Sequence, residues 1–200
     1  MVTAAESFDA TTTSSTGACP RCAARSRYVP GGTPTSVKRP ASSVNVWRPT
    51  GWSDPHYSLR TRDYVGVVAI DRAGRLLLVR QFRPAVWAET LEIPSGHVED
   101  DQTPEQAARA ELLEETGHVA EKFELLANLS PDTGRLANRM WCFFAGDAEP
   151  TRDPAHRAEP GVDFVAREGG VRALLADPDF CSALNRAVIL HAVLAGRLAF

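Results

Sequence analysis

Residues 94–117 read PSGHVEDDQTPEQAARAELLEETG, a sharp turn followed by a stretch that is unusually dense in carboxylates. Glu111, Glu114 and Glu115 follow the spacing i, i+3 and i+4, so a helix places all three on one face. Such like charges destabilise a helix unless a cation offsets them, and hard carboxylate oxygens suit Mg²⁺ or Mn²⁺. A solvated helix face that binds nothing is the alternative interpretation.

Capping signals predict where this helix begins and ends. Thr103 is a good N-cap, Pro104 fits the first helical position, and Gln106 completes a capping box with Thr103. Gly117 supplies the C-terminal stop. The apolar side of the predicted helix consists of Ala107, Ala108, Leu112 and Leu113.

The turn before the helix strengthens the metal interpretation. Pro94, Ser95 and Gly96 end a strand and turn sharply, which lets the Ser95 carbonyl approach a cation. Gly96 permits a close approach of the backbone, and Glu99 offers a further oxygen donor. We therefore expect a cation between this turn and the acidic helix face.

The segments around the helix predict an α/β fold. Residues 64–71 and 75–82 are rich in branched apolar side chains and form a plausible hairpin through Arg72-Ala73-Gly74. The other expected elements are strands at 87–93, 123–130 and 139–147, a loop at 148–161, an extended stretch at 162–167, and helices within 171–177 and 183–196. This order indicates a sandwich with a mixed sheet and helices on its faces.

Composition limits the class of protein. The chain has 200 residues, of which 44% are hydrophobic, and a net charge of -3, which gives no general attraction to nucleic acid. No apolar run is long enough to cross a bilayer and no secretory signal is evident, so we expect a cytoplasmic protein without a membrane partner. Residues 1–42 are rich in Ser, Thr, Pro and Gly and predict a disordered or loosely attached arm before a domain at 43–200.

Four cysteines give no clear metal site. Cys19 and Cys22 form a CPRC pair that suits half of a zinc ribbon, a redox pair or a relic in a loose tail. Cys142 and Cys181 lie in apolar stretches, so we expect both to be buried. We also expect Trp87 and Trp141 in the core, and packing or surface roles for His97 and His118.

The acidic stretch resembles the box of the Nudix hydrolase family, and its surroundings resemble the branch that hydrolyses ADP-ribose and nucleoside-diphosphate sugars. The matching residues are Gly96, Glu111, Leu112, Glu114, Glu115 and Gly117, with LLLVRQFRP and TLEIPSG before the box and LSPDTGRLANRMWCFFA after it. The resemblance implies a Nudix-type α/β/α sandwich over residues 43–200, with the box at 96–118. Gln102 and Ala110 depart from the Glu and Arg of the family, and Arg109 is about 100° around the helix from the missing arginine.

The resemblance also implies Mg²⁺- or Mn²⁺-dependent hydrolysis of a pyrophosphate linkage. Glu111 and Glu115 are the first expected ligands, and Glu114, the Ser95 carbonyl and Glu99 complete the set. In this branch a mobile loop often supplies the general base. The corresponding loop here contains Glu159, for which a solvated surface carboxylate is an equal alternative, and Glu149 and His156 are held in reserve.

Substrate contacts are expected from three places. Arg80 and Arg83 are interpreted as projecting in the same direction from one strand, where they could hold phosphates by paired hydrogen bonds. Internal ion pairs are the alternative for both arginines. Arg135 and Asn138 are lesser candidates for the sugar or terminal group.

Trp47 and Trp52 lie in the segment that, in this branch, often reaches across a homodimer to stack on the base. Simple packing is the alternative for both tryptophans. An ADP-ribose-like substrate is the first hypothesis, and other sugar nucleotides are the second. A non-catalytic nucleotide sensor or interaction module is the third, because Gln102 and Ala110 depart from the box.

Overall fold

The computed structural model describes residues 43–47, 50–51 and 53–200, without the side chain of Trp47. The predicted arm at 1–42, its CPRC pair and Trp52 lie outside the described residues. The described elements are β1 (Ser43–Trp47), β2 (His56–Arg60), β3 (Tyr64–Asp71), β4 (Leu76–Arg83), β5 (Ala88–Glu92), β6 (Ser95–His97), α1 (Pro104–Thr116), β7 (His118–Val119), β8 (Glu124–Leu129), β9 (Met140–Pro150), β10 (Val162–Arg167), α2 (Gly170–Leu175) and α3 (Ala183–Leu194).

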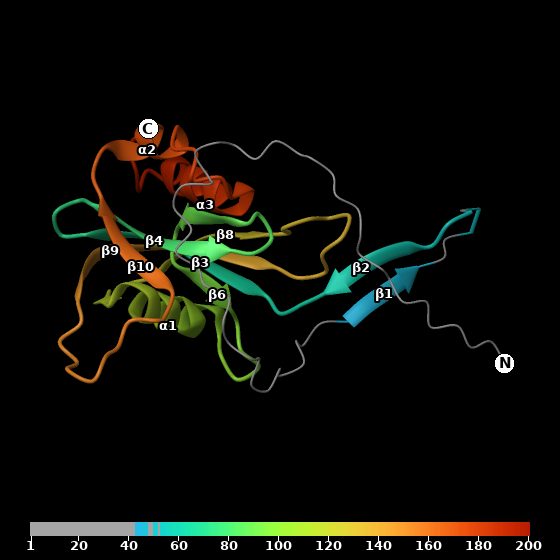
Figure 1. Ribbon diagram of the computed structural model, residues 1–200, viewed down its shortest axis with the longest axis horizontal. Helices are drawn as coiled ribbons and strands as arrows, with labels where there is room; N and C mark the ends of the chain where they lie inside the picture. The colour runs from blue at the N-terminus through green and yellow to red at the C-terminus, as the bar shows by residue number, and fades with distance from the viewer. Residues whose placement is uncertain (1–42, 48–49, 52) are drawn as a thin grey trace. The chain divides into compact units, whose positions relative to one another are not determined.

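The main sheet is mixed and is built around β3 (Figure 1). Its order is β10-β4-β3-β9-β7, with β5 paired to β4, β6 paired to β3 and β8 paired to β9. The β3–β9 pair is parallel and the other pairs are antiparallel. Because β6 pairs with β3 in the register Val65↔Gly96, the turn before the helix is held against the centre of the sheet.

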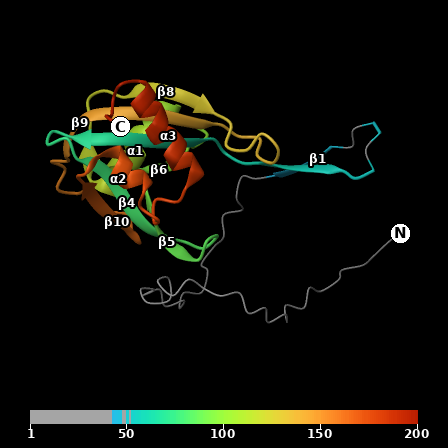
Figure 2. The ribbon, with the colours of Figure 1, turned by 90° about the horizontal axis from the view of Figure 1, so that it is seen from above.

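Helices cover both faces of this sheet, as predicted. α1 packs on one face through Ala107, Ala108 and Leu112. α2 and α3 pack on the other, where Val188 and Ile189 join the second buried cluster (Figures 1 and 2). Alternate residues of β4 contribute to the two clusters, Leu77 to the first and Leu76 and Leu78 to the second.

The predicted ends of α1 and the predicted hairpin are confirmed. The Thr103 side chain accepts from the Gln106 N–H while the Gln106 side chain accepts from the Thr103 N–H, so the capping box is complete. Gly117 has a left-handed φ of 69° and donates its N–H to the Leu113 carbonyl, which ends the helix. Gly74, with φ 78°, closes the turn between β3 and β4.

Three expectations about burial and length are wrong. Trp87 is 72% exposed, because it ends the turn between β4 and β5 with a left-handed φ of 51°. Cys181 is exposed because it directly precedes the N-cap of α3, whereas Cys142 is buried as predicted. The expected loop at 148–161 is shorter at its start, because β9 continues to Pro150 where it pairs with β7.

Trp141 is partly buried against the α1 side of the sheet, and its indole N–H donates to Asp63. No helix in the described part of the chain has the length and apolar character needed to cross a bilayer.

Candidate active site

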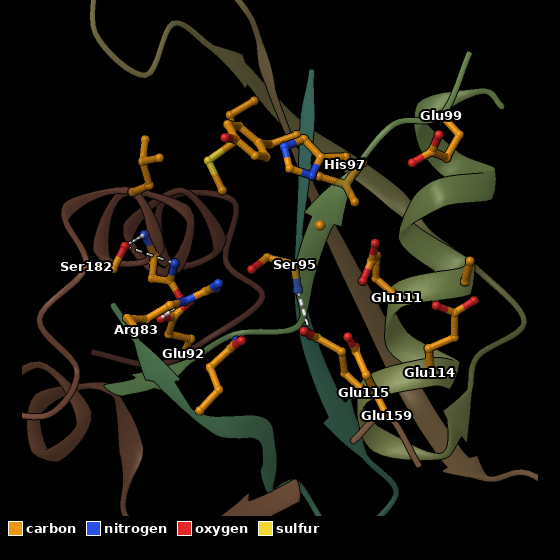
Figure 3. Close-up of a pocket in the computed structure, with 18 of the residues that line it drawn as sticks. Arg83, Glu92, Ser95, His97, Glu99, Glu111, Glu114, Glu115, Glu159 and Ser182 are labelled. Atoms are coloured by element: carbon orange, nitrogen blue, oxygen red, sulfur yellow. Dashed lines mark hydrogen bonds and ion pairs between the residues drawn. The ribbon is translucent and has the colours of Figure 1, made fainter. Parts of the chain in front are cut away.

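A pocket of about 690 Å³ opens beside β6, within the size range of small-molecule sites. Two different walls face each other across Ser95 (Figure 3). One wall carries Glu111, Glu114 and Glu115 from α1, and the opposite wall carries Arg83 and other polar groups. The full lining is Tyr64, Val65, Gln81, Arg83, Glu92, Ser95, Gly96, His97, Glu99, Gln102, Ala110, Glu111, Glu114, Glu115, Leu136, Met140, Glu159, Ser182, Leu184 and Asn185.

Glu115 is a buried carboxylate and Glu111 is a partly buried one, and no cationic side chain pairs with either among the described residues. Glu115 is 5% exposed, and its Oε2 accepts from the Ser95 N–H at 2.9 Å. Burial raises the pKa of Glu115 to about 8, and the neighbouring charges of Glu111 and Glu159 act in the same direction. Burial likewise raises the pKa of Glu111 to about 7, with contributions from Glu114 and Glu159. A cation bound between them would offset this charge.

Gly96 is required by the position of Glu111. A Cβ atom at residue 96 would lie 1.8 Å from Glu111 Oε1 and 2.2 Å from its Cδ, distances that no side chain tolerates. The turn therefore admits the Glu111 carboxylate only because residue 96 has no side chain. The approach of the Ser95 carbonyl to a cation stays a prediction, and the structure brings the Glu111 carboxylate close to the backbone at Gly96.

The other predicted acidic residues occupy the rim of the pocket. The exposed Glu159 lines the pocket, and its N–H donates to the Glu114 carbonyl at 3.3 Å, which holds the 156–161 loop against α1. Glu99 also lines the pocket but forms an ion pair with Arg62. The reserve candidates are not among the lining residues: Glu149 pairs with Arg72, and His156 lies beside Gly117.

Gln102 and Ala110 both lie at this pocket. Gln102 Oε1 accepts from the Glu99 N–H at 3.3 Å, and Ala110 contributes to the lining. Arg109 points elsewhere, since it binds the Glu105 carboxylate and the Ala120 and Glu121 carbonyls. The prediction that Arg109 does not replace the missing arginine is confirmed.

The carboxylates of α1 are of the chemical type that binds a divalent cation. Among the described residues, no group of three or more His, Cys, Asp or Glu side chains is gathered closely enough to hold a metal ion by itself. The α1 carboxylates form an open wall of the pocket, and a cation would balance the charges of the buried Glu115 and the partly buried Glu111. Carboxylate oxygens beside a backbone carbonyl are the ligands that Mg²⁺ and Mn²⁺ prefer.

The two arginines of β4 do not point the same way, so that expectation is wrong. A spacing of three residues along a strand places side chains on opposite faces. Arg83 lines the pocket and pairs with Glu92 through two hydrogen bonds, whereas Arg80 pairs with Asp179 outside the lining. Both therefore make the internal ion pairs that were the alternative.

The remaining predicted substrate residues are not among those lining the pocket. Arg135 donates to the Tyr57 carbonyl, and Asn138 donates to the Arg62 carbonyl. Trp52 and the side chain of Trp47 lie outside the described residues.

Several lining residues carried no signal in the sequence. Glu92 is 6% exposed, although it lies in a strand that also carries Glu89 and Thr90, so its charge alone did not distinguish it. Asn185 is buried, where its Oδ1 accepts from the Ile93 N–H at 2.7 Å and its amide donates to Ser182. His97 stacks on Tyr64 with a ring separation of 4.6 Å, and burial together with the Arg62 charge lowers the pKa of His97.

Comparisons with known proteins give a consistent family signal. Residues 60–172 match the model of the NUDIX domain, which is more than half of the chain. The ADP-ribose pyrophosphatase of Bacillus subtilis (strain 168) is 35% identical over 78 residues, 39% of this chain and 42% of that protein. The ADP-sugar pyrophosphatase of Mus musculus is 44% identical over 59 residues, 30% of this chain and 27% of that protein.

A third relative is the methanol dehydrogenase activator of Bacillus methanolicus, 31% identical over 90 residues, 45% of this chain and 49% of that protein. The chain thus spans less than half the length of these curated relatives.

Solved structures agree with the fold. A crystal structure described as an ADP compounds hydrolase has a TM-score of 0.61 at 22% identity, covering 82% of this chain and all of that chain. A NUDIX hydrolase from Nitrosomonas europaea has a TM-score of 0.52 at 22% identity, covering 68% of this chain and 90% of that chain.

Proposed function

Because the chain belongs to the NUDIX family, we propose that it hydrolyses the pyrophosphate linkage of a nucleoside diphosphate joined to a sugar or related group. The observation that carries this proposal is the opposition of an acidic α1 wall and the Arg83 guanidinium across one pocket. A diphosphate placed between them meets a cation on one side and a fixed positive charge on the other. The products would be two monophosphates.

The ligands of the proposed cation are Glu111, Glu114 and Glu115 with the Ser95 carbonyl. When bound, Mg²⁺ or Mn²⁺ supplies charge neutralisation at the phosphoryl oxygens and an attacking water of lowered pKa. Glu99 is a weaker candidate than expected, since its carboxylate is engaged by Arg62.

Glu159 is the proposed general base. It stands at the pocket on a loop that its own N–H fastens to α1, and it is solvent-exposed, so water reaches it. Its carboxylate accepts a proton from the attacking water. Arg83 holds a phosphoryl oxygen of the substrate, because guanidinium N–H groups match phosphate geometry.

An ADP-ribose-like compound is the substrate that we propose first. Its support is the similarity to the ADP-ribose pyrophosphatase of Bacillus subtilis and the ADP-sugar pyrophosphatase of Mus musculus. Stacking of the base on Trp47 or Trp52 remains part of this proposal, as do contacts from Arg135 and Asn138. GDP- or UDP-sugars are the alternative within the same chemistry.

We also propose that the protein forms a homodimer. Val44 and Val46 of β1 and Tyr57 and Leu59 of β2 lie on one face of a two-stranded sheet and are 44–57% exposed. A two-stranded sheet is marginal by itself, and an apolar face of this kind gains stability when a second copy covers it. A monomeric sedimentation profile would overturn this part of the proposal.

The second candidate function is a nucleotide-sensing or interaction module with weak or no catalysis. Two observations favour it: the degenerate box positions Gln102 and Ala110, and a relative named as an activator of another enzyme. The three retained glutamates argue against it, because a binding module gains nothing from crowding like charges on one helix face. Ala110→Arg tests whether the missing guanidinium limits the rate.

The deciding experiment incubates the protein with Mg²⁺ and a panel of ADP-, GDP- and UDP-sugars, with monophosphate release as the readout. We expect release from at least one compound and a loss of two or more orders of magnitude in Glu115→Gln. Glu105→Gln is the matched control, because Glu105 lies on the same helix but pairs with Arg109 away from the pocket. Unchanged turnover in Glu115→Gln would remove that residue from the mechanism.

A further inference from the structure

Arg83 is the only Lys or Arg among the described residues that line the pocket, and a neighbouring carboxylate holds it firmly. Its Nε–H donates to Glu92 Oε1 at 2.8 Å and its Nη2 donates to Glu92 Oε2 at 2.7 Å. The Thr90 hydroxyl donates to Glu92 Oε1 at 2.6 Å. The guanidinium is therefore clamped in one orientation by a carboxylate that is itself fixed.

Glu92 and Thr90, which hold Arg83 in place, are buried, although the Arg83 side chain itself is accessible. Glu92 and Thr90 are 6% and 4% exposed, whereas the Arg83 side chain is 42% exposed. In the described part of the chain, Arg83 Nη1 has no hydrogen-bond partner, so donors remain for a ligand in the pocket. A buried ion pair adds little net stability, because desolvation of both charges offsets their attraction. Stability alone is thus a poor explanation for this pair.

Released from Glu92, the guanidinium has a competing partner in the same pocket. Glu115 faces Arg83 across the pocket, and a carboxylate and a guanidinium attract each other. A planar guanidinium can engage both oxygens of a carboxylate. Paired in this way, Arg83 would occupy oxygens that the proposed cation needs.

We propose that Glu92, supported by Thr90, is a positioning residue that keeps Arg83 on the wall opposite α1. There the guanidinium meets a phosphoryl oxygen of the substrate and leaves the Glu115 carboxylate free for the cation. The identity of both ligands rests on the proposed function. In this proposal Glu92 acts through Arg83, because both of its carboxylate oxygens accept hydrogen bonds from that guanidinium.

The test measures Mn²⁺ binding by calorimetry in the absence of nucleotide, which needs no turnover. Glu92→Gln should bind Mn²⁺ about tenfold more weakly than the wild type, because the freed Arg83 pairs with Glu115. Arg83→Ala combined with Glu92→Gln should restore wild-type affinity, since the competing guanidinium is gone. A purely structural role for Glu92 predicts no such rescue. Wild-type affinity in folded Glu92→Gln, or equal weakness in the double variant, overturns the proposal.

Steady-state kinetics provide a second readout with ADP-ribose as the probe. Glu92→Gln should raise KM about tenfold, and adding the same change to Arg83→Ala should raise KM no further. Should Glu92→Gln fail to fold, Thr90→Val carries the test with a loss of Mn²⁺ affinity of about threefold, and no loss would overturn the proposal.

Failure of the inference differs from failure of the proposed function. Wild-type protein that binds Mn²⁺ and hydrolyses a diphosphate, with Glu92→Gln unaffected in both, removes only the role of Glu92. Wild-type protein that neither binds Mn²⁺ nor hydrolyses any compound removes the proposed function and this inference together.

Discussion

Gly96→Ala is the change that most specifically disturbs the proposed metal site. The new methyl group would lie 1.8 Å from Glu111 Oε1, and real Cβ atoms essentially never come within 3.0 Å of such a neighbour. The carboxylate oxygen therefore has to move by at least about 1.2 Å. The atoms that clash with the new methyl group lie at the end of the flexible Glu111 side chain. We therefore expect the carboxylate to move and the backbone to keep its position.

The expected effect on catalysis follows from that displacement. A misplacement of about 1 Å in a reacting site costs roughly a hundredfold in rate. We expect kcat/KM of Gly96→Ala to fall by about that factor, equivalent to about 2.7 kcal/mol of transition-state stabilisation. Affinity for Mn²⁺ should fall in parallel, since Glu111 is a proposed ligand.

The assay compares Gly96→Ala with Gly146→Ala in Mn²⁺ titration, ADP-ribose hydrolysis and thermal unfolding. Gly146 lies in β9 outside the pocket lining, and a Cβ there would lie 3.3 Å from the Phe144 ring, so the control adds a methyl group without touching the site. Both variants should unfold near the wild-type temperature. Wild-type metal affinity and turnover in Gly96→Ala would refute the placement of Glu111 at the cation.

Three further changes test separate parts of the site. Glu111 and Glu115 have pKa values raised by burial, so the folded metal-free protein binds more protons than the unfolded chain and should lose a few kcal/mol of stability as pH rises from about 4.5 to about 8. Thermal melts across that range, with Mn²⁺ restoring the melting temperature at pH 8, check the sign, and a rise in metal-free stability with pH would contradict it. Glu159→Gln should lower kcat by about a hundredfold or more with Mn²⁺ affinity retained, and wild-type rates would rule out its role as base. Arg109→Ala should lower the free energy of unfolding by about 1–2 kcal/mol through lost contacts with the Ala120 and Glu121 carbonyls, with KM and kcat unchanged in the same assays.

Local signals in the sequence were sufficient for α1 and the first hairpin. Thr103, Gln106 and Gly117 specify the ends of the helix through contacts within a few residues, and the structure forms each of them. The spacing of the box glutamates likewise depends only on the helical repeat. These features were predictable because nothing distant in the chain decides them.

Contacts between distant segments were not predictable in the same way. The parallel pairing of β3 with β9 joins Tyr64 to Met140 and brings the apolar side of the pocket together. The pairing of Glu92 with Arg83 is closer in sequence, since β5 folds back on β4 through the turn at 84–87, but the sequence pattern does not show which side chains then meet. Trp87 is apolar in type but exposed, because the turn between those two strands places it at the surface.

Calorimetric titration of Mn²⁺ into the wild type and Glu111→Gln, with and without ADP-ribose, tests most directly whether a cation binds between Ser95 and the acidic face of α1. We expect the wild type to bind Mn²⁺ saturably, and more tightly with the nucleotide present. In Glu111→Gln the affinity for Mn²⁺ should fall by about tenfold or more. Absence of binding by folded wild-type protein, even with the nucleotide present, would contradict the account.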